Sequence, residues 1–497
     1  MTSKIYDMLV IGGGINGVSI ARDAAGRGLS VLLCEKDDLA GATSSASSKL
    51  IHGGLRYLEH YSFRLVREAL GERRVLLKNA PHIIWPLEFV LPHVPALRPA
   101  WMLRIGLWLY DFLAGRQALT RSRGVTLRGA GYGAGLKPDF DRGFVYSDCW
   151  VDDARFVVLS AVDAAERGAE ILTRAPCTEA RRDGDHWVAA VDVGGRPREV
   201  RARTLVNAAG PWVEQVIQQV VRANSPADVR LVKGSHIVVP RLYHEAHAFI
   251  LQNEDGRVIF VIPYEEEFSL IGTTDIPRDA GPGPVEISEA ETAYLCEAVD
   301  RYFAKPVTPS DVVWSFAGVR PLYDDGESDP SDVTRDYVLA LDGGDDRPPM
   351  LSVFGGKITT ARKLAEHALS RLQEAGVPMA PMWTATAPLP GGDVASFADY
   401  LAGLQSRFPA LDPNWLGGLA RRHGTRAEAI LGNTASVDDL GRAFGGGLYE
   451  REVDWLVEQE WATEAADILW RRTKCGLHMT PSERRAFEDY MDSRRSG

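Results

Sequence analysis

The sequence predicts an α/β protein with three parts: a Rossmann-like dinucleotide-binding domain, a domain built on an antiparallel sheet, and a helical C-terminal domain. Three observations lead to this prediction. Residues 5–36 read as strand, glycine-rich turn, helix and strand, which is the order of a parallel βαβ unit. Runs rich in β-branched residues follow between residues 204 and 271. Beyond the proline- and glycine-rich segment 388–392 the sequence is mostly helical.

Length and composition allow a large folded core. The chain has 497 residues, of which 45% are hydrophobic and 25% charged, as in ordinary globular proteins. Its net charge of −11 argues against nucleic-acid binding but leaves room for a local basic pocket. Five cysteines without a CxxC pair predict free thiols in a reducing compartment and no zinc site. We see no signal-peptide pattern and no apolar run long enough to span a bilayer.

The first turn carries the dinucleotide fingerprint. Gly12, Gly14 and Gly17 fit G-x-G-x-x-G between a strand and a helix. Gly12 permits the tight turn, Gly14 lets the backbone approach a pyrophosphate, and Gly17 allows close packing of helix on strand. Glu35 ends the second strand, where it can accept hydrogen bonds from a ribose and disfavours a 2′-phosphate. A single copy of the motif in so long a chain favours FAD over NAD as the resident cofactor.

Hydrophobic spacing places the other elements. Residues 62–80 predict an amphipathic helix, and residues 452–472 predict another. The glycine-rich stretch 129–135 runs into Pro138 and predicts a loop. The strand-like runs, which we assign together to the antiparallel sheet, are residues 204–207, 235–239, 258–262 and 268–271.

Residues 42–57 are rich in hydroxyl groups and small side chains. They could wrap a pyrophosphate and the edge of an isoalloxazine ring, with Lys49 and His52 adding charge or donors near the flavin. A solvated serine-rich loop is the alternative from composition alone.

The run from Ile11 to Tyr57 resembles the FAD-dependent glycerol-3-phosphate dehydrogenases, which are aerobic and membrane-associated enzymes. The likeness continues in order through residues 146–155, 206–212, 233–240, 271–275, 318–322, 334–337 and 352–360. It is dense over residues 5–370 and loose in the C-terminal domain. It implies a glutathione-reductase- or D-amino-acid-oxidase-like fold. We divide the chain into an FAD-binding domain (1–55, 145–230 and 335–388), a substrate-binding domain (56–144 and 231–334) and a helical domain (389–497).

The resemblance implies oxidation of sn-glycerol 3-phosphate to dihydroxyacetone phosphate by hydride transfer to FAD, with the electrons passed to a quinone of the respiratory chain. His236 is the expected base, because an imidazole with a pKa of about 6.5 can take a proton near neutrality. A structural histidine is the alternative. Arg320 could instead stabilise the developing alkoxide. The residues expected to bind the substrate are Arg56, Tyr57, Arg320, Arg335 and Lys357.

The residues expected to hold FAD come from the glycine turn, the serine-rich segment and later glycine motifs. Gly210 and Gly355 follow strand-like runs and would allow close approach of the flavin. Thr359 is expected to cap the next helix. The full set is Gly12, Gly14, Asn16, Gly17, Glu35, Thr43, Ser44, Ser45, Ser47, Lys49, Leu50, His52, Ala209, Gly210, Gly318, Gly355, Lys357, Ile358 and Thr359. No metal site is predicted.

The apolar stretch 99–113 raises the question of a membrane. Its tryptophans and the nearby Arg98, Arg104 and Arg116 suit a helix in a bilayer interface, and a buried core helix is the alternative. By resemblance, we expect a peripheral protein on the cytoplasmic side of the cytoplasmic membrane, and otherwise a cytoplasmic one. Formation of a homodimer and support of the membrane-facing segment are the two roles considered for the helical domain.

Two other functions compete with the dehydrogenase. A glycerol-3-phosphate oxidase would share the substrate pocket and use oxygen as the electron acceptor. A flavin-binding module with a structural or regulatory role would have lost the chemistry. The intact motifs around His236, Arg320 and Lys357 argue against this last reading.

Overall fold

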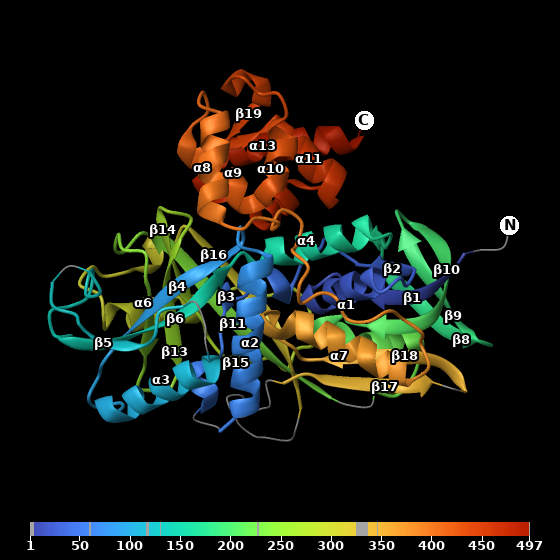
Figure 1. Cartoon of the computed structure of the whole chain (residues 1–497), viewed down its shortest axis with the longest axis horizontal. Helices are drawn as coiled ribbons and strands as arrows, with labels where there is room; N and C mark the ends of the chain where they lie inside the picture. Colours follow the sequence, from blue (N-terminus) through green and yellow to red (C-terminus); the bar gives the residue numbers. More distant parts are fainter. Residues whose placement is uncertain are drawn as a thin grey trace.

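The structure, a computed structural model, describes residues 4–58, 61–115, 119–129, 131–225, 228–324, 336–344 and 346–496. Two sheets with their helices form the body of the molecule, and a helical C-terminal domain, drawn orange to red, packs on one side of it (Figure 1). The predicted α/β class with a helical C-terminal domain is confirmed.

The first sheet contains the predicted βαβ unit. Strand β1 (Ile5–Ile11) pairs in parallel with β2 (Val31–Cys34) and with β10 (Arg196–Asn207), and α1 (Ile15–Gly26) connects β1 to β2. The sheet is completed by β18 (Arg347–Phe354), β17 (Val338–Gly344), β7 (Glu170–Leu172), and the hairpin of β8 (Cys177–Asp183) and β9 (His186–Val193). Strand β2 is buried throughout, as expected for a parallel strand covered on both faces.

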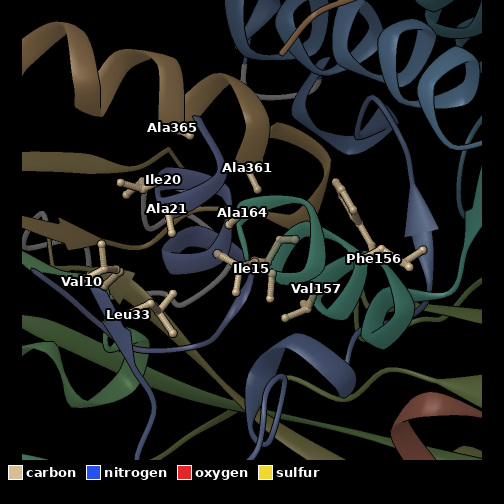
Figure 2. Close-up of a cluster of buried hydrophobic side chains, with 14 of the residues drawn as sticks. Val10, Ile15, Ile20, Ala21, Leu33, Phe156, Val157, Ala164, Ala361 and Ala365 are labelled. Atoms are coloured by element: carbon tan, nitrogen blue, oxygen red, sulfur yellow. The ribbon is translucent and has the colours of Figure 1, made fainter. Parts of the chain in front are cut away.

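One face of this sheet is covered by three helices: α1, α4 (Asp153–Glu166) and α7 (Ala361–Glu374). Figure 2 shows the cluster that they form with the strands. Ala21, Ala164 and Ala361 are fully buried, and their small side chains let the helices approach closely. Val10 and Leu33 contribute the larger side chains of the strands to the same cluster.

The second sheet is larger and mostly antiparallel. Its order is β15-β11-β14-β13-β12-β4-β6-β3, with β16 paired to β11 and β5 paired to β6. The bounds are β3 (Leu50–Ile51), β4 (Ile84–Pro92), β5 (Arg123–Thr126), β6 (Arg142–Val151), β11 (Val229–Pro240), β12 (Ala248–Gln252), β13 (Val258–Tyr264), β14 (Phe268–Gly272), β15 (Ile276–Pro277) and β16 (Trp314–Tyr323). Helix α6 (Glu289–Asp300) packs against β11 and β13.

Three of the four predicted strand runs lie in this antiparallel sheet, and one does not. Residues 235–239, 258–262 and 268–271 fall in β11, β13 and β14, as predicted. Residues 204–207 instead form the end of β10, which lies parallel to β1 in the first sheet, so their assignment was wrong. The first part of β10 pairs antiparallel with β9, and only its buried last part enters the parallel sheet.

Two segments cross the boundaries that the sequence suggested. Residues 50–51 and 142–151 pair within the second sheet, although the predicted FAD-binding domain included residues 1–55 and 145–230. Strand β6 is buried over most of its length, and its sequence consists of short apolar runs on either side of Ser147 and Asp148. Such runs do not reveal which sheet the strand joins.

The helices follow their predicted ranges except near the C-terminus. Helices α2 (Phe63–Asn79) and α3 (Ala100–Ala114) match the expected segments, and residues 129 and 131–135 form turns. The predicted helix 452–472 is broken: α11 (Glu450–Glu460) ends at Trp461, whose φ of 57° is left-handed. The Asp467 carboxylate then accepts hydrogen bonds from the backbone of Thr463 and Glu464 and starts a π-helical turn. The other helices of this domain are α8 (Phe397–Arg407), α9 (Pro413–His423), α10 (Ala427–Leu431), α12 (Cys475–His478) and α13 (Pro481–Ser496).

Candidate functional site

A cavity of about 690 Å³ collects most of the residues expected to act on the substrate. Its walls come from the serine-rich segment, α3, the loop before α7, and strands β4, β6, β11, β12, β13 and β16 of the second sheet. The predicted residues that line it are Thr43, Ser44, Ser47, Leu50, His52, Tyr57, His236, Gly318, Arg320, Gly355, Lys357, Ile358 and Thr359. Arg335 lies outside the described residues, and the side chain of Arg56 is likewise not described.

His236 is held flat in the wall of the cavity by its strand neighbours. In β11 it lies opposite Phe316 on one side and Gly272 on the other. The imidazole stacks on Phe316 with ring centroids 4.8 Å apart. A Cβ atom at position 272 would lie 2.0 Å from the imidazole Cδ2, so only glycine leaves room for the ring. The register of three strands therefore fixes the orientation of the histidine.

The environment of His236 keeps it neutral. The side chain is only 3% exposed, and its Nε2 lies 2.9 Å from the Ser48 hydroxyl oxygen. Burial lowers the pKa of His236 well below its ordinary value, and the positive charges of Arg320 and Lys49 lower it further. A neutral imidazole at physiological pH can accept a proton, as a general base must.

Arg320 lies across the backbone of Gly234 at the same level of the sheet. A Cβ atom at position 234 would lie 2.3 Å from the arginine Nη2, so this glycine also makes room for a functional side chain. Arg320 forms an ion pair with Asp275, and its Nη2 donates to the Thr273 hydroxyl oxygen over 3.1 Å. Sequence reasoning assigned no role to Thr273 or Asp275, although both lie in a segment that carries the family resemblance.

Lys357 supplies a second cation. Its ammonium lies 3.9 Å from the centroid of the Tyr57 ring. Within the described part of the chain, Lys357 forms no ion pair with a carboxylate. In the cavity, the charge of Arg320 is therefore paired, whereas that of Lys357 is open to an anion.

The glycine turn fits the pyrophosphate of a dinucleotide. Gly12 has a φ of 113°, and a Cβ atom there would lie 2.6 Å from the Ala208 carbonyl oxygen. A Cβ atom at Gly17 would lie 1.9 Å from the Gly12 carbonyl oxygen. Helix α1 has Gly14 as its N-cap residue and no acidic residue in its first turn, and the Ile15 N–H at this end donates to the uncharged Ser44 hydroxyl. Its positive end is therefore open to a phosphate group.

Asn16 connects this turn to the loop before α7. Its Nδ2 donates to the Gly355 carbonyl oxygen over 3.0 Å, and its Oδ1 is buried without a partner in the described chain. Gly355 and Gly356 both have positive φ, at 73° and 97°. A Cβ atom at Gly356 would lie 2.8 Å from the Asn16 Nδ2, so glycine permits this close approach. The start of α1 and the loop with Lys357 thus form one continuous wall.

The serine-rich segment is anchored and is not a solvated loop. The Ser44 hydroxyl oxygen accepts the Ile15 backbone N–H over 3.0 Å, and the Thr43 hydroxyl donates to the Val319 carbonyl oxygen over 2.6 Å. The Ser47 hydroxyl donates to Asp153 over 2.7 Å. Composition favoured the solvated loop as strongly as the anchored one, and these contacts exclude it.

Several predicted cofactor residues have other partners. Lys49 is buried in an ion pair of 2.7 Å with Asp153, so it holds the serine-rich segment in place and is not a donor in the cavity. Thr359 does not cap α7, because Thr360 is the N-cap residue and makes no side-chain cap. The Thr359 hydroxyl oxygen instead accepts the His52 backbone N–H over 3.4 Å. Glu35 accepts the backbone N–H of Gly13 over 2.6 Å and so supports the glycine turn from within the chain.

The remaining predicted residues do not line the cavity. The residues outside the lining are Gly12, Gly14, Asn16, Gly17, Glu35, Ser45, Lys49, Ala209 and Gly210. Gly210 has a φ of 55°, which favours glycine, but its position faces open space. A Cβ atom at Gly318 would lie 2.7 Å from the Cβ of Ala46, so this glycine lets the serine-rich segment pack on β16.

A parallel sheet with an open helix terminus, joined to a second sheet with a cation-lined cavity, defines a dinucleotide-dependent oxidoreductase. The chain belongs to the FAD dependent oxidoreductase family, whose profile matches residues 7–362. Residues 382–492 match the C-terminal domain of alpha-glycerophosphate oxidase. The protein is therefore an enzyme, and FAD is its cofactor.

Individual relatives cover nearly the whole chain. The glycerol-3-phosphate dehydrogenase of Pseudomonas aeruginosa is 54% identical over 99% of this chain and 96% of its own length. The D-erythritol 1-phosphate dehydrogenase of Brucella abortus is 52% identical over 98% of each chain. Among solved structures, the glycerol-3-phosphate dehydrogenase of Bacillus halodurans complexed with FAD superposes with a TM-score of 0.74 at 25% identity, covering 100% of this chain and 95% of that chain.

Proposed function

We propose that this enzyme oxidises sn-glycerol 3-phosphate to dihydroxyacetone phosphate and passes the electrons to a quinone. The observation that carries the proposal is a single cavity that holds Lys357, Arg320 and the buried His236. Two cations suit a phosphate ester, and a neutral imidazole suits an alcohol that must lose its proton. The name of the Pseudomonas aeruginosa relative agrees with this choice of substrate.

Each residue has a distinct part in the proposed reaction. FAD, when bound, accepts a hydride from the carbon that carries the alcohol. Lys357 binds the phosphate as a point charge. Arg320 is oriented before substrate arrives, because Asp275 and Thr273 already hold it, and it stabilises the oxygen as negative charge develops there. His236 is the base for the hydroxyl proton.

A four-carbon substrate is the main competitor. The Brucella abortus relative is named for D-erythritol 1-phosphate, and its 52% identity is close to the 54% of the Pseudomonas aeruginosa relative. Both substrates carry a phosphate ester and a secondary alcohol, so Lys357 and His236 suit both. A test must therefore distinguish the two substrates by the length of their carbon chains.

Anaerobic titration of the purified holoenzyme tests the substrate. Glycerol 3-phosphate is expected to bleach the flavin absorbance, whereas glycerol and glycine at the same concentration leave it unchanged. Stronger bleaching by D-erythritol 1-phosphate would move the assignment to a four-carbon substrate. If neither phosphate ester bleaches the flavin, the proposed function is wrong.

The exposed apolar face of helix α3 supports the proposal that the electron acceptor is a quinone that arrives from a membrane. Trp101, Ile105, Trp108 and Phe112 on this helix are between 56% and 68% exposed, and only Leu107 and Tyr110 are buried. A contiguous apolar surface of this kind is typical of an interaction site, and a short helix of this composition suits the bilayer interface. The alternative of a buried core helix does not fit these exposures. Among the described helices, none combines the length and apolar character needed to cross a bilayer.

The same helix forms part of the cavity wall. Its cavity-lining residues are Met102, Leu103, Ile105, Gly106, Leu107 and Leu109. The Tyr110 hydroxyl donates to Asp148 over 2.8 Å, and the Ser122 backbone donates to Asp111 over 2.9 Å. Arg104 donates to the Ser122 carbonyl oxygen over 2.9 Å, so it fixes the helix from its polar side. Arg116 lies outside the described residues. An apolar quinone that reaches α3 from a lipid surface would therefore lie next to the wall of the cavity.

Two measurements test the acceptor and the membrane. Reoxidation of the reduced enzyme should be faster with a soluble quinone analogue than with oxygen, and the reverse order would favour the oxidase. The variant Trp108→Ser/Phe112→Ser should bind anionic liposomes about 10-fold more weakly, because it loses apolar surface that inserts into the interface. Val437→Ser, at an exposed apolar residue of the helical domain, is the control and should bind as the wild type does. Equal binding by all three proteins would refute the membrane role of α3.

A further inference from the structure

We propose that Ser48 relays the proton of the substrate alcohol to His236, so that the substrate and the imidazole exchange the proton through a serine hydroxyl. This inference rests on the proposed function, because it requires an alcohol as the substrate. Ser48 lies in the serine-rich segment and was not among the residues that the sequence singled out.

The position of Ser48 supports the relay. Its hydroxyl oxygen lies 2.9 Å from Nε2 of His236, and the residue itself is partly exposed and lines the cavity. His236 Nδ1 is buried and has no hydrogen-bond partner in the described chain. Nε2 is therefore the nitrogen through which a proton can enter or leave, and its contact is the Ser48 hydroxyl.

The imidazole is not free to turn toward the substrate. Phe316 stacks on the ring, and the backbone of Gly272 lies against its Cδ2 edge. Rotation about χ1 would lose the stacking with Phe316 and would separate Nε2 from Ser48. Proton transfer by a moving imidazole is therefore disfavoured, and transfer through a fixed neighbour is favoured.

The hydroxyl groups of the neighbouring serines form hydrogen bonds to groups other than His236. The Ser47 hydroxyl donates to Asp153, and the Ser45 hydroxyl donates to the Ala42 carbonyl oxygen over 3.3 Å. Ser44 accepts the Ile15 backbone N–H. Of these four serines in the described segment, Ser48 is the one whose hydroxyl contacts the imidazole.

The step balances in atoms and electrons. The O–H bond of the alcohol breaks and its proton passes to the Ser48 oxygen, while the proton of Ser48 passes to Nε2 of His236. The C–H bond breaks and its electron pair leaves with the hydrogen as a hydride, so the alcohol is oxidised to a ketone, and FAD would be the oxidant that takes up the hydride. Arg320 and Lys49 disfavour a charged imidazole, so the proton leaves His236 again through Ser48 after the ketone has departed.

Two variants of Ser48 test the relay. Ser48→Ala removes the hydroxyl, and Ser48→Thr keeps it. The limiting rate of anaerobic flavin reduction, measured per bound FAD, should fall about 100-fold in Ser48→Ala and less than about 10-fold in Ser48→Thr. Ser370→Ala is the control, because the Ser370 hydroxyl bonds the Glu366 carbonyl oxygen in α7, outside the cavity lining. Its rate should equal that of the wild type.

A proton inventory in mixtures of light and heavy water separates a relay from a structural role. The wild type should show two protons in flight, and Ser48→Ala should show one. Wild-type reduction rates in Ser48→Ala, or the same inventory in both proteins, would overturn the relay. The proposed function fails in a different way, because the flavin of the wild type would then not be bleached by either phosphate ester.

Discussion

The interface with the helical domain and the cavity both bring arginines to carboxylates, but they do so under opposite conditions. Two ion pairs at the interface are sealed from water: Arg155 and Glu460 have side-chain exposures of 0% and 2%, and Arg472 and Asp38 have the same values. In the cavity, the side chain of Arg320 is 31% exposed and that of Asp275 is 26% exposed.

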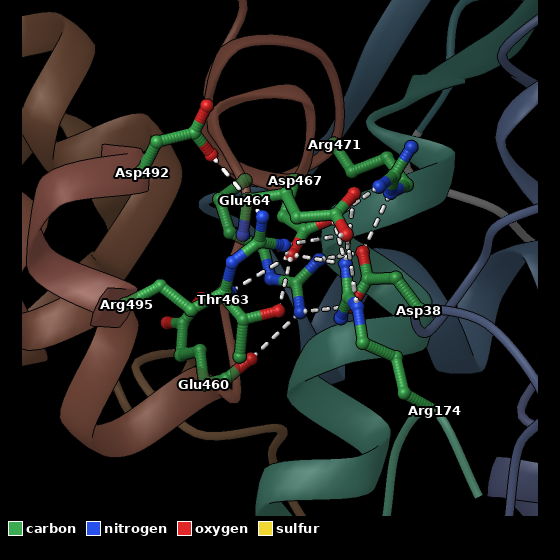
Figure 3. Close-up of polar contacts among 10 residues, drawn as sticks. Asp38, Arg174, Glu460, Thr463, Glu464, Asp467, Arg471, Asp492 and Arg495 are labelled. Carbon is green, nitrogen blue, oxygen red and sulfur yellow. Dashed lines mark hydrogen bonds and ion pairs between the residues drawn. The ribbon is translucent and has the colours of Figure 1, made fainter. Parts of the chain in front are cut away.

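The two regions also differ in whether their charged groups are paired. Figure 3 shows Asp467 at the centre of the interface network, where it accepts hydrogen bonds from Arg174 and Arg471 and from the backbone of Thr463. In the cavity, Lys357 forms no ion pair in the described chain. Buried, paired charges fix how the two domains pack together, whereas a cavity with an unpaired lysine can bind an anionic ligand.

The largest expected effect is on the free energy of unfolding, and it comes from the interface with the helical domain. Arg155→Met leaves the Glu460 carboxylate buried without its main partner and should lower the free energy of unfolding by about 3–5 kcal/mol. Urea-induced unfolding of the holoenzyme measures the loss. Arg155→Met/Glu460→Leu removes both charges and should recover much of it.

The control for this effect is the exposed pair of Arg494 and Asp454 on the helical domain, with side-chain exposures of 32% and 44%. Arg494→Met should cost less than about 1 kcal/mol. Similar losses in Arg155→Met and Arg494→Met would contradict the distinction between sealed and exposed pairs.

The next largest effect is expected on the rate of flavin reduction, and it comes from a residue of the cavity. His236→Ala should slow flavin reduction by about 100-fold or more, because it removes the proton acceptor. FAD content should not change, since His236 lies in the second sheet and the glycine turn in the first. Stopped-flow absorbance measures the rate, and a reduction rate equal to that of the wild type would exclude His236 as the base.

A smaller effect is expected in how the stability of the fold depends on pH, and it comes from a second buried histidine. His82 is fully buried, and neither of its ring nitrogens has a hydrogen-bond partner in the described chain. Burial, together with the nearby charge of Arg155, lowers the pKa of His82 to about 3. The folded state therefore keeps this histidine neutral, while the unfolded chain binds a proton below about pH 6.5, so stability falls as the pH falls.

The comparison with His82→Gln isolates this contribution. Between about pH 7 and about pH 5 the wild type should lose about 2 kcal/mol more stability than the variant does. Urea unfolding at the two pH values measures both proteins. Equal losses would mean that His82 is not the group that titrates.

The sequence predicted local features of the site but not those that depend on the register between strands or on packing between distant segments. Gly12 and Gly17 could be assigned because their roles follow from a short motif between a strand and a helix. Gly272 and Ser48 could not, because their contacts with His236 depend on which residues lie opposite each other in the second sheet and on how a distant segment packs against it. Nothing short of the fold shows that residue 272 must be glycine to admit an imidazole.

Two features that the sequence did not show have the same origin. The Lys49 side chain pairs with Asp153, which lies far along the chain. Residues 204–207 were expected in the antiparallel sheet because the run is short and apolar, and β10 enters the parallel sheet only in its last part. Partner choice across long sequence distances is a tertiary property that periodicity does not encode.

The proposed reaction depends on Lys357 binding the phosphate of the substrate, and a comparison of two substrates in Lys357→Met tests this role most directly. The efficiency of anaerobic flavin reduction should fall about 10- to 100-fold for glycerol 3-phosphate, because one charged contact to the phosphate is lost. For glycerol, which has no phosphate and must be supplied at a far higher concentration to reduce the flavin, it should change less than about 3-fold. An equal loss for both substrates would show that Lys357 does not bind the phosphate and would contradict this account.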